Sequence, residues 1–311
     1  MEFTHRPVMV REVIRFLNCR SHGIYVDGTV GGGGHALEIL KATSPGGVLV
    51  GLDRDEEALA AAEKTLKPYG KRVFLVRENF GALKEVLTDL GFAQVDGILL
   101  DLGVSSHQLE EPGRGFSFRF DGRLDMRMDT TQELTARDLV NNLEAKDLAA
   151  ILWKYGEERF SMRIARSIVE ARKKKPVETT AELAEIAAAA VPKKFHPRRI
   201  HPATKTFQAL RIAVNDELGN LERGLKGGME VLSPGGRFVV ISYHSLEDRL
   251  VKDAFRRAAA GCVCPPRIPM CVCGKTPSAR IVTKKAVPPG AAEIEENPRA
   301  RSAKLRAVEK L

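Results

Sequence analysis

The sequence predicts an α/β fold in which a doubly wound, parallel sheet is interrupted by a helical insertion. Three observations support this prediction. Strand and helix patterns alternate through the first hundred residues, strand signals then vanish between about 109 and 203, and a buried strand pattern returns at Arg237–Tyr243. Alternating strands and helices are typical of parallel sheets, because each crossover between parallel strands needs a long connection that is usually a helix.

Apolar runs bounded by turn residues predict four strands in the first hundred residues, and helix patterns fill the stretches between them. The helix after the second strand begins with acidic residues, which complement the positive end of the helix dipole. The strands are expected at Gly23–Thr29, Val48–Asp53, Arg72–Arg77 and Val95–Asp101, and the helices at His35–Lys41, Asp55–Lys67 and Gly81–Leu90.

A polar loop rich in glycine and arginine follows the fourth strand, and a series of helix patterns follows the loop. Thr179 and Glu182 have the spacing of a capping box, which indicates the start of the last of these helices. We therefore predict a helical, substrate-recognition domain at 109–203, inserted into a discontinuous core made of 1–108 and 204–311. Its helices are expected at Ala136–Asn142, Lys146–Tyr155, Met162–Lys174 and Ala181–Ala190.

The core pattern resumes with one long helix pattern at Thr206–Leu232, a turn, and the buried strand at Arg237–Tyr243. Ser245 is placed to cap a helix that runs to about Ala260. The last fifty residues are rich in proline, glycine and basic residues, and they carry one further strand pattern at Arg280–Lys284.

The composition is that of an ordinary globular protein with a basic balance. The 311 residues are 43% hydrophobic and 29% charged, with a formal net charge of +9. A basic chain is typical of a protein with a polyanionic partner, although a solvated surface gives the same balance. No signal peptide or membrane-spanning run is evident, since the longest uncharged apolar stretch is near Ile186–Val191. A cytoplasmic location without membrane association is therefore expected.

The strongest local signal is a glycine-rich loop directly after the first predicted strand. Four consecutive glycines at Gly31–Gly34 let the backbone turn tightly and approach a ligand, and the helix that starts at His35 points its dipole at that ligand. Asp53 follows Gly33 by twenty residues and ends the second strand. A carboxylate at that position meets ribose hydroxyls in doubly wound nucleotide folds, so the loop predicts a nucleotide-like cofactor.

Two classes of cofactor fit this loop. The pattern from Gly31 to Ala36 matches the dinucleotide fingerprint, which admits an NAD-dependent oxidoreductase. Asp27 favours S-adenosylmethionine, because an acid directly before the loop would repel a pyrophosphate but suits the ammonium of a methionine moiety. Phe80 follows the third strand and can pack on an adenine. Asp101 ends the fourth strand at the same edge of the sheet.

Asp101 and His244 are the candidates for catalysis. A carboxylate that accepts an N–H from an aromatic amine localises the nitrogen lone pair, so Asp101 is predicted to do this or to bond the cofactor. His244 follows the buried strand at Arg237–Tyr243 and is predicted to shuttle a proton or to stack on a base. Methylation of a cytosine carbon would need a nucleophilic thiol near the site. Cys19 is the only cysteine in the N-terminal core, and it precedes the cofactor strand, where it is badly placed for attack. The sequence therefore favours nitrogen as the methyl acceptor.

Several sequence blocks occur together from one end of the chain to the other. They are HRPVM at His5–Met9, DGTVGGGGH at Asp27–His35, DLGVSS at Asp101–Ser106, RGFSF at Arg114–Phe118, LDMRM at Leu124–Met128, HPATKTFQALR at His201–Arg211, SYHSLEDR at Ser242–Arg249 and NPRARSAK at Asn297–Lys304. Together these blocks resemble the ribosomal RNA small-subunit methyltransferase H family.

The resemblance implies a class I, Rossmann-like, S-adenosylmethionine-dependent methyltransferase core with an inserted helical domain. It implies methyl transfer to the N4 amine of a decoding-site cytosine in 16S rRNA, with the small ribosomal subunit or its late precursor as the substrate, and it leaves a homodimer open. Carried over by motif, the cofactor-binding residues are Gly33, Gly34, His35, Asp53, Phe80, Asp101 and Gln108.

Two positions depart from the wider methyltransferase class. Thr29 stands where the usual first glycine of the loop falls. Asp101-Leu-Gly replaces the Asp/Asn-Pro-Pro-aromatic motif of many amino-methyltransferases. The detailed mechanism of those DNA enzymes is therefore not carried over to this chain.

A basic segment at Lys193–His201 mixes cations with Phe195 and two histidines. Cations neutralise phosphates, and an aromatic ring can stack on an unpaired base. The segment is therefore predicted to contact RNA, with Lys194, Arg198 and Arg199 as its phosphate contacts. A target base in structured RNA is expected to be splayed out into the active site.

Four of the five cysteines lie close together, as Cys262-x-Cys264 and Cys271-x-Cys273. In a cytoplasmic protein such a cluster indicates metal binding before disulfide formation. The gap within each pair is shorter than the common spacing of zinc ligands, so zinc binding and four free thiols both stay open. No metal is assigned to the predicted active site.

Two rival functions share parts of these patterns. An NAD-dependent oxidoreductase shares the glycine loop but does not explain Asp27 or the basic segments. An rRNA-binding assembly factor with a vestigial fold explains the basic segments but not the intact set of Asp27, Asp53 and Asp101.

Overall fold

The computed structural model describes residues 7–197, 200–262, 264, 270 and 272–311. His5, Arg198, Arg199 and Cys271, named above, lie outside these residues. The described chain forms two compact units. The first consists of the residues up to Gly103 and from Leu218 onward, and the second is Val104–Glu217.

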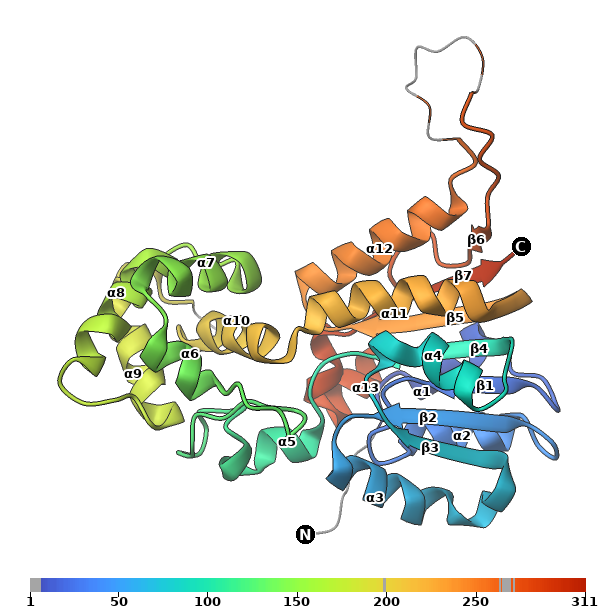
Figure 1. The fold of residues 1–311 in the computed structure, drawn as a ribbon, viewed down its shortest axis with the longest axis horizontal. Coiled ribbons are helices and arrows are strands. Elements are labelled where there is room, and N and C mark those ends of the chain that lie inside the picture. The colour runs from blue at the N-terminus through green and yellow to red at the C-terminus, as the bar shows by residue number, and fades with distance from the viewer. Residues whose placement is uncertain (1–6, 198–199, 263, 265–269, 271) are drawn as a thin grey trace. The chain divides into compact units, whose positions relative to one another are not determined.

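A seven-stranded sheet forms the centre of the first unit, in the order β3-β2-β1-β4-β5-β7-β6 (Figure 1). Strands β1 to β5 are parallel, whereas β7 runs antiparallel to both β5 and β6. The order changes direction between β1 and β4, which is where ligands bind in such sheets. The strands are β1 Ile24–Asp27, β2 Val48–Asp53, β3 Val73–Arg77, β4 Val95–Asp101, β5 Leu232–Ser242, β6 Ala279–Ile281 and β7 Lys304–Lys310. The predicted class I fold is confirmed.

Helices cover both faces of this sheet, because alternate strand residues point to opposite faces. Val26, Ile98 and Val240 belong to the core under α4, α11 and α12, whereas Tyr25 and Leu99 belong to the core under α1, α2 and α3. The α-helices of this unit are α1 Val10–Leu17, α2 Gly34–Ala42, α3 Glu56–Leu66, α4 Leu83–Asp89, α11 Glu217–Val231, α12 Ser245–Ala259 and α13 Ala291–Glu296, and its 3₁₀ turns are η1 Lys67–Arg72, η2 Phe80–Ala82 and η5 Pro298–Ser302.

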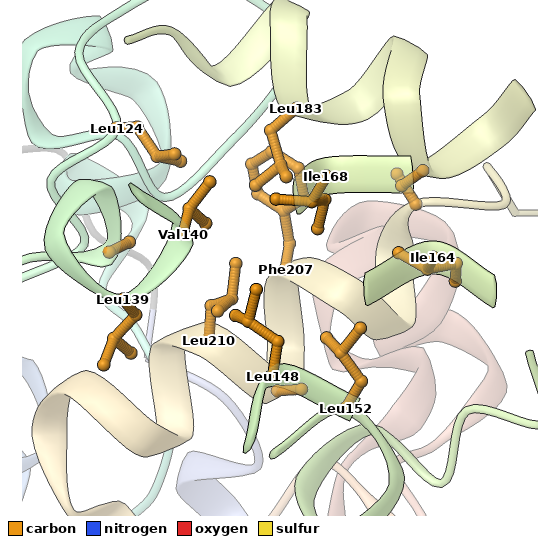
Figure 2. Packing of buried hydrophobic residues seen from close by; sticks show 14 of the residues in the cluster. Leu124, Leu139, Val140, Leu148, Leu152, Ile164, Ile168, Leu183, Phe207 and Leu210 are labelled. Atoms are coloured by element: carbon orange, nitrogen blue, oxygen red, sulfur yellow. The ribbon is translucent and has the colours of Figure 1, made fainter. Parts of the chain in front are cut away.

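The second unit is helical and has a hydrophobic core of its own. Figure 2 shows Leu148, Ile168, Leu183 and Phe207 converging from different helices. These residues come from helix patterns whose apolar positions recur on one face. The elements are α5 Ser106–Glu110, α6 Ala136–Asn142, α7 Ala145–Gly156, α8 Ser161–Arg172, α9 Thr180–Ala190, α10 Thr204–Asn215 and the 3₁₀ turns η3 Pro112–Arg114 and η4 Lys193–Phe195.

The helical unit starts earlier and ends later than the predicted domain at 109–203. It begins at Val104 and ends at Glu217. The later end follows from α10, which carries Phe207, Leu210 and Val214 into the helical core. Helix α10 is therefore part of the helical unit in the structure, whereas the sequence pattern attached it to the core.

The prediction of a single helix over Thr206–Leu232 is wrong. The structure has two helices, because Asp216 takes a left-handed conformation with φ 44° and ends α10 with an N–H donated to the Ile212 carbonyl. Strand β7 is a further difference, since no strand was predicted after Lys284. It pairs with β5 in the register Phe238↔Val308.

No described helix is long and apolar enough to span a membrane.

Candidate cofactor and acceptor site

Three acids end neighbouring parallel strands of the first unit. Asp27 ends β1, Asp53 ends β2 and Asp101 ends β4. In the sheet register Asp27 lies opposite Gly51 of β2 and Leu99 of β4. Because the carboxyl ends of parallel strands share one edge, the fold brings all three predicted acids to one site.

The glycine loop is tied to the strands on both sides of β1. The Gly28 N–H donates to the Leu99 carbonyl at 2.9 Å, and the Val30 N–H donates to the Leu52 carbonyl at 2.9 Å. A side chain at Gly28 would meet Leu100 at 2.5 Å, so the backbone there needs glycine. The loop therefore lies directly on the sheet edge that carries the acids.

Helix α2 begins at the end of this loop. Gly33 precedes it in a left-handed conformation with φ 85°, which favours glycine, and no side chain caps the first turn. The first N–H groups of the helix, from Gly34 and His35, are therefore left for a ligand. The cofactor contacts of Gly33, Gly34 and His35 stay a prediction.

Asp27 is the one of the three acids that has a buried carboxylate oxygen without a hydrogen-bond partner in the described residues. It is 1% exposed, and its Oδ1 accepts the Thr29 N–H at 3.1 Å. Its Oδ2 has no hydrogen-bond partner among the described residues. Burial raises the pKa of Asp27 to about 6, and the nearby His35 and the Thr29 N–H offset this only in part. A buried, unpaired carboxylate oxygen fits a cationic ligand group such as the ammonium of S-adenosylmethionine.

Asp53 uses both oxygens to hold the backbone. Its Oδ2 accepts the Gly31 N–H at 2.9 Å and its Oδ1 accepts the Asp55 N–H at 3.0 Å. Burial raises the pKa of Asp53, and these two N–H groups oppose the shift. Each carboxylate oxygen keeps one lone pair, which suits the predicted contact with ribose hydroxyls.

Phe80 lies beside the glycine loop. A Cβ atom at Gly28 would be 3.0 Å from the Phe80 Cβ. Phe80 opens the 3₁₀ turn after β3, which Asn79 caps by accepting the Gly81 N–H at 2.8 Å. The sequence-predicted aromatic is therefore placed at the loop.

Asp101 is held by three neighbours from different elements. Its backbone N–H donates to the Thr29 hydroxyl at 2.7 Å, and its Oδ1 accepts the Tyr243 hydroxyl at 2.8 Å. Its Oδ2 lies 3.4 Å from the His35 Nε2. One carboxylate oxygen is thus fixed by a neutral donor, and the other faces an imidazole.

Thr29, which stands where the wider methyltransferase class has glycine, has a structural role for its side chain. Its hydroxyl accepts the Asp101 N–H and lies 3.4 Å from Asp27 Oδ1, to which it donates. The side chain therefore links the ends of β1 and β4. Glycine at this position could not make that link.

His35 is buried among the acids. It is 5% exposed, and neither ring nitrogen has a well-formed hydrogen bond within the described part of the chain. Burial lowers the pKa of His35, but the contact with Asp101 and the charge of Asp27 outweigh it and raise the pKa above the ordinary value. The imidazole is therefore biased toward the charged form.

Tyr243 is a site residue that the sequence analysis missed. Burial, and then the negative charge of Asp101, raise its pKa well above the ordinary value, so the hydroxyl stays a proton donor. Its backbone N–H donates to Glu247 Oε2 at 2.8 Å, which fixes the turn after β5. The signal was present, because Tyr243 is the first residue after β5, and β5 pairs with β4 next to Asp101.

His244 caps helix α12. Its Nδ1 accepts the Glu247 N–H at 3.4 Å, and its Nε2 lies 3.1 Å from Glu247 Oε1. The cap that was expected at Ser245 is therefore provided by His244. It is Tyr243, not His244, that contacts Asp101, and the catalytic role of His244 stays a prediction.

Gln108 belongs to the helical unit. It is 5% exposed, its Oε1 accepts the Ser105 N–H at 3.1 Å, and its own N–H donates to the Ser105 hydroxyl at 3.2 Å. These two bonds form the capping box of α5. The structure gives Gln108 a helix-capping role, and its contact with the cofactor stays a prediction.

Phe195 in the basic segment is 41% exposed and has cations against its ring. The Arg159 guanidinium lies 5.2 Å and the Lys194 ammonium 5.1 Å from the ring centroid. The Phe160 ring packs at 5.2 Å. The segment thus presents positive charge around an aromatic ring.

Comparison with known proteins covers the whole chain. A family model described as the MraW methylase family matches residues 2–311. A Geotalea uraniireducens protein named Ribosomal RNA small subunit methyltransferase H is 56% identical over 310 residues, which cover 100% of this chain and 99% of that protein. The Geobacter sulfurreducens protein of the same name is 57% identical over 311 residues, covering 100% of both.

Solved structures are more distant. A putative rRNA methylase from Clostridium thermocellum aligns with a TM-score of 0.44 at 11% identity, over 97% of this chain and 95% of that chain. A score of this size is too low to argue from.

We predict that S-adenosylmethionine binds more tightly as the pH rises through about 6, where Asp27 loses its proton. The ionised carboxylate attracts the ammonium and the protonated one does not, so each pH unit below the pKa weakens binding by up to about tenfold. The positive charge of His35 favours the ionised form of Asp27, so loss of that charge should move the midpoint to higher pH. Calorimetric titration between about pH 5 and about pH 8 measures the slope.

Two variants separate these contributions. Asp27→Asn is expected to bind weakly at every pH and to lose the slope, whereas His35→Gln should keep the slope and move its midpoint to higher pH. A wild-type affinity that stays constant across the range contradicts the prediction.

Proposed function

The chain belongs to the MraW methylase family, and on that premise we propose that it methylates the exocyclic N4 amine of a decoding-site cytosine in the 16S rRNA of the small ribosomal subunit. The enzyme class and the cofactor, S-adenosylmethionine, are as predicted from the sequence. Family membership excludes the oxidoreductase reading. Relatives of 56% and 57% identity, both named Ribosomal RNA small subunit methyltransferase H, support an rRNA substrate.

The residues at the sheet edge suit this cofactor. Asp27 would hold its ammonium, Asp53 its ribose hydroxyls, and Phe80 would pack on its adenine. The N–H groups at the start of α2 would hold its carboxylate. When bound, the cofactor supplies an electrophilic methyl group on a sulfonium.

The observation that carries the proposed reaction is the fixation of Asp101. A cytosine amine is a weak nucleophile, because its lone pair is delocalised into the ring. Tyr243 occupies Asp101 Oδ1, so Oδ2 is the oxygen that would accept an N–H of the amine. That hydrogen bond localises the lone pair, and positioning for in-line attack supplies much of the remaining rate.

Asp101 Oδ2 can also receive the proton that the amine releases on methylation. On transfer the amine would gain one N–C bond as the sulfur–methyl bond of the cofactor breaks, and it would lose one N–H bond, whose proton Asp101 Oδ2 would take. His35 Nε2 lies 3.4 Å from that oxygen and, in its neutral form, can accept the proton next. Tyr243 keeps its own proton, because its pKa is raised well above the ordinary value by burial and by the Asp101 charge.

His244 enters the proposal as a positioning residue. It caps α12 and, together with Glu247, fixes the turn that carries Tyr243. A direct contact of His244 with the target base stays a prediction.

The helical unit is proposed to bind the rRNA. Arg159 and Lys194 lie over the exposed ring of Phe195, which suits phosphates next to an unpaired base. A ribosomal substrate also implies a cytoplasmic location. A homodimer stays a prediction.

We predict that small subunits from cells lacking the enzyme gain N4-methylcytidine when incubated with the protein and labelled S-adenosylmethionine. Nucleoside mass spectrometry of the digested RNA identifies the product. Asp101→Ala should lower its yield by about 10²-fold or more, because the group that activates the amine is lost.

The matched control is Asp89→Ala, which removes an exposed acid at the end of α4 and should leave the yield unchanged. Label that appears as another methylated nucleoside refutes the N4 assignment. Cofactor binding with no label on RNA refutes the rRNA substrate.

We also predict that replacing Lys194, Arg198 and Arg199 together by alanine weakens binding to small subunits. Each lost phosphate contact removes counterion release, so the dependence of log affinity on log salt should flatten by about 2 to 3. Filter binding across a range of salt concentrations measures both quantities.

A control with the same change of charge is available on the first unit. Lys64, Lys67 and Lys71 are exposed on α3 and the turn after it, and their replacement by alanine should leave the salt slope unchanged. Equal losses in the two triple variants would mean that net charge, not this segment, sets the affinity.

A further inference from the structure

We propose that the protein binds one Zn²⁺ ion through Cys262, Cys264 and Cys273, in the segment that connects α12 to β6. None of these residues takes part in the site at the sheet edge. Figure 1 shows the described part of this segment leading away from α12 and back to β6.

The three sulfur atoms already have the spacing of ligands on a single ion. They all lie within 4.8 Å of one another, and the Sγ atoms of Cys262 and Cys273 are 3.8 Å apart. Zn–S bonds of about 2.3 Å in a tetrahedral site place neighbouring sulfurs about 3.8 Å apart. A disulfide requires about 2.05 Å, so the observed separation matches shared coordination and not a covalent bond.

Backbone donors surround the sulfurs. The Cys264 N–H donates to Cys262 Sγ at 3.4 Å, and the Val272 N–H donates to Cys264 Sγ at 3.4 Å. Gly274, with φ 58°, turns the chain directly after Cys273. Such outer contacts orient ligand atoms around a metal.

The three described thiolates supply three of the four ligands that a tetrahedral zinc takes in structural sites. Cys271 lies outside the described residues and is not one of the proposed ligands.

The described part of the segment is held at its base by hydrogen bonds and has exposed apolar side chains beyond them. Its base is closed by the Ser278 N–H on the Ala258 carbonyl at 2.9 Å and by the Lys275 ammonium on the Arg257 carbonyl at 2.6 Å. Met270 and Val272 are 78% and 77% exposed, so these apolar side chains form no core. Small elements without a core usually need a metal or a disulfide, and a metal fits the sulfur spacing here.

Three thiolate ligands at this spacing favour zinc over other metals and over an iron–sulfur cluster. Thiolates bind soft and borderline metals in preference to magnesium or calcium. In an iron–sulfur cluster the cysteines are shared among several irons, which separates their sulfurs further than ligands on one ion. A single tetrahedral zinc accounts for the close spacing of all three described sulfurs.

The test is the metal content of the full-length protein, purified without an affinity tag under reducing conditions and then dialysed. We expect about one zinc per chain in the wild type by plasma mass spectrometry, and the same in Cys19→Ser, which removes the cysteine that lies outside the cluster. Cys262→Ser, Cys264→Ser and Cys273→Ser should each lose most of the metal. Cobalt substitution should give thiolate-to-cobalt absorption in the wild type and not in these variants.

A second readout uses the wild type alone, so it does not depend on how the variants fold. Chelation should speed tryptic cleavage after Arg267 and Lys275, and added zinc should reverse this. Zinc far below one per chain after reconstitution overturns the proposal, whether the thiols are then free or joined in a disulfide. Iron in place of zinc overturns it as well.

Discussion

The crowding of three carboxylates at one edge of a parallel sheet is the constraint on which the rest of the site depends. Asp27, Asp53 and Asp101 end strands that the fold must place side by side. Burial raises the pKa of Asp27 and of Asp53, so bringing these carboxylates together costs electrostatic free energy. A ligand with an ammonium and a sulfonium relieves that cost, which explains why an acidic site suits this cofactor in a basic protein.

The three acids differ in their proposed roles because they differ in the hydrogen bonds that they already make. Asp53 is bonded to two backbone N–H groups and Asp27 keeps one oxygen unpaired, whereas Asp101 is fixed by Tyr243 and Thr29. A fixed carboxylate can present one oxygen to an incoming amine without reorganising, and this preorganisation is a main source of rate in such sites. The turn held by Glu247 therefore matters to the chemistry, although Glu247 itself is assigned no contact with substrate.

Local patterns predict the strands, the glycine loop and the acids, because each depends on a short run of residues. They do not predict what depends on contacts between distant segments. Tyr243 was passed over in favour of His244, since sequence gives residue type but not which of two neighbours faces the sheet edge. Strand β7 is stabilised by antiparallel pairing with β5, and the break at Asp216 is a single left-handed residue. The alternation of polar and apolar residues in β7 spans only Lys304–Ala307, and a single left-handed residue leaves no pattern.

The most direct test of this division of labour is to measure cofactor affinity and single-turnover methyl transfer at saturating cofactor in Asp27→Asn, Asp101→Asn and Tyr243→Phe. The account predicts that Asp27→Asn weakens cofactor binding and largely keeps the rate. Asp101→Asn should keep the affinity and lower the rate by about 10²-fold or more, and Tyr243→Phe should lower the rate by about tenfold. An Asp101→Asn variant that binds the cofactor poorly, yet transfers methyl at the wild-type rate when saturated, would contradict it.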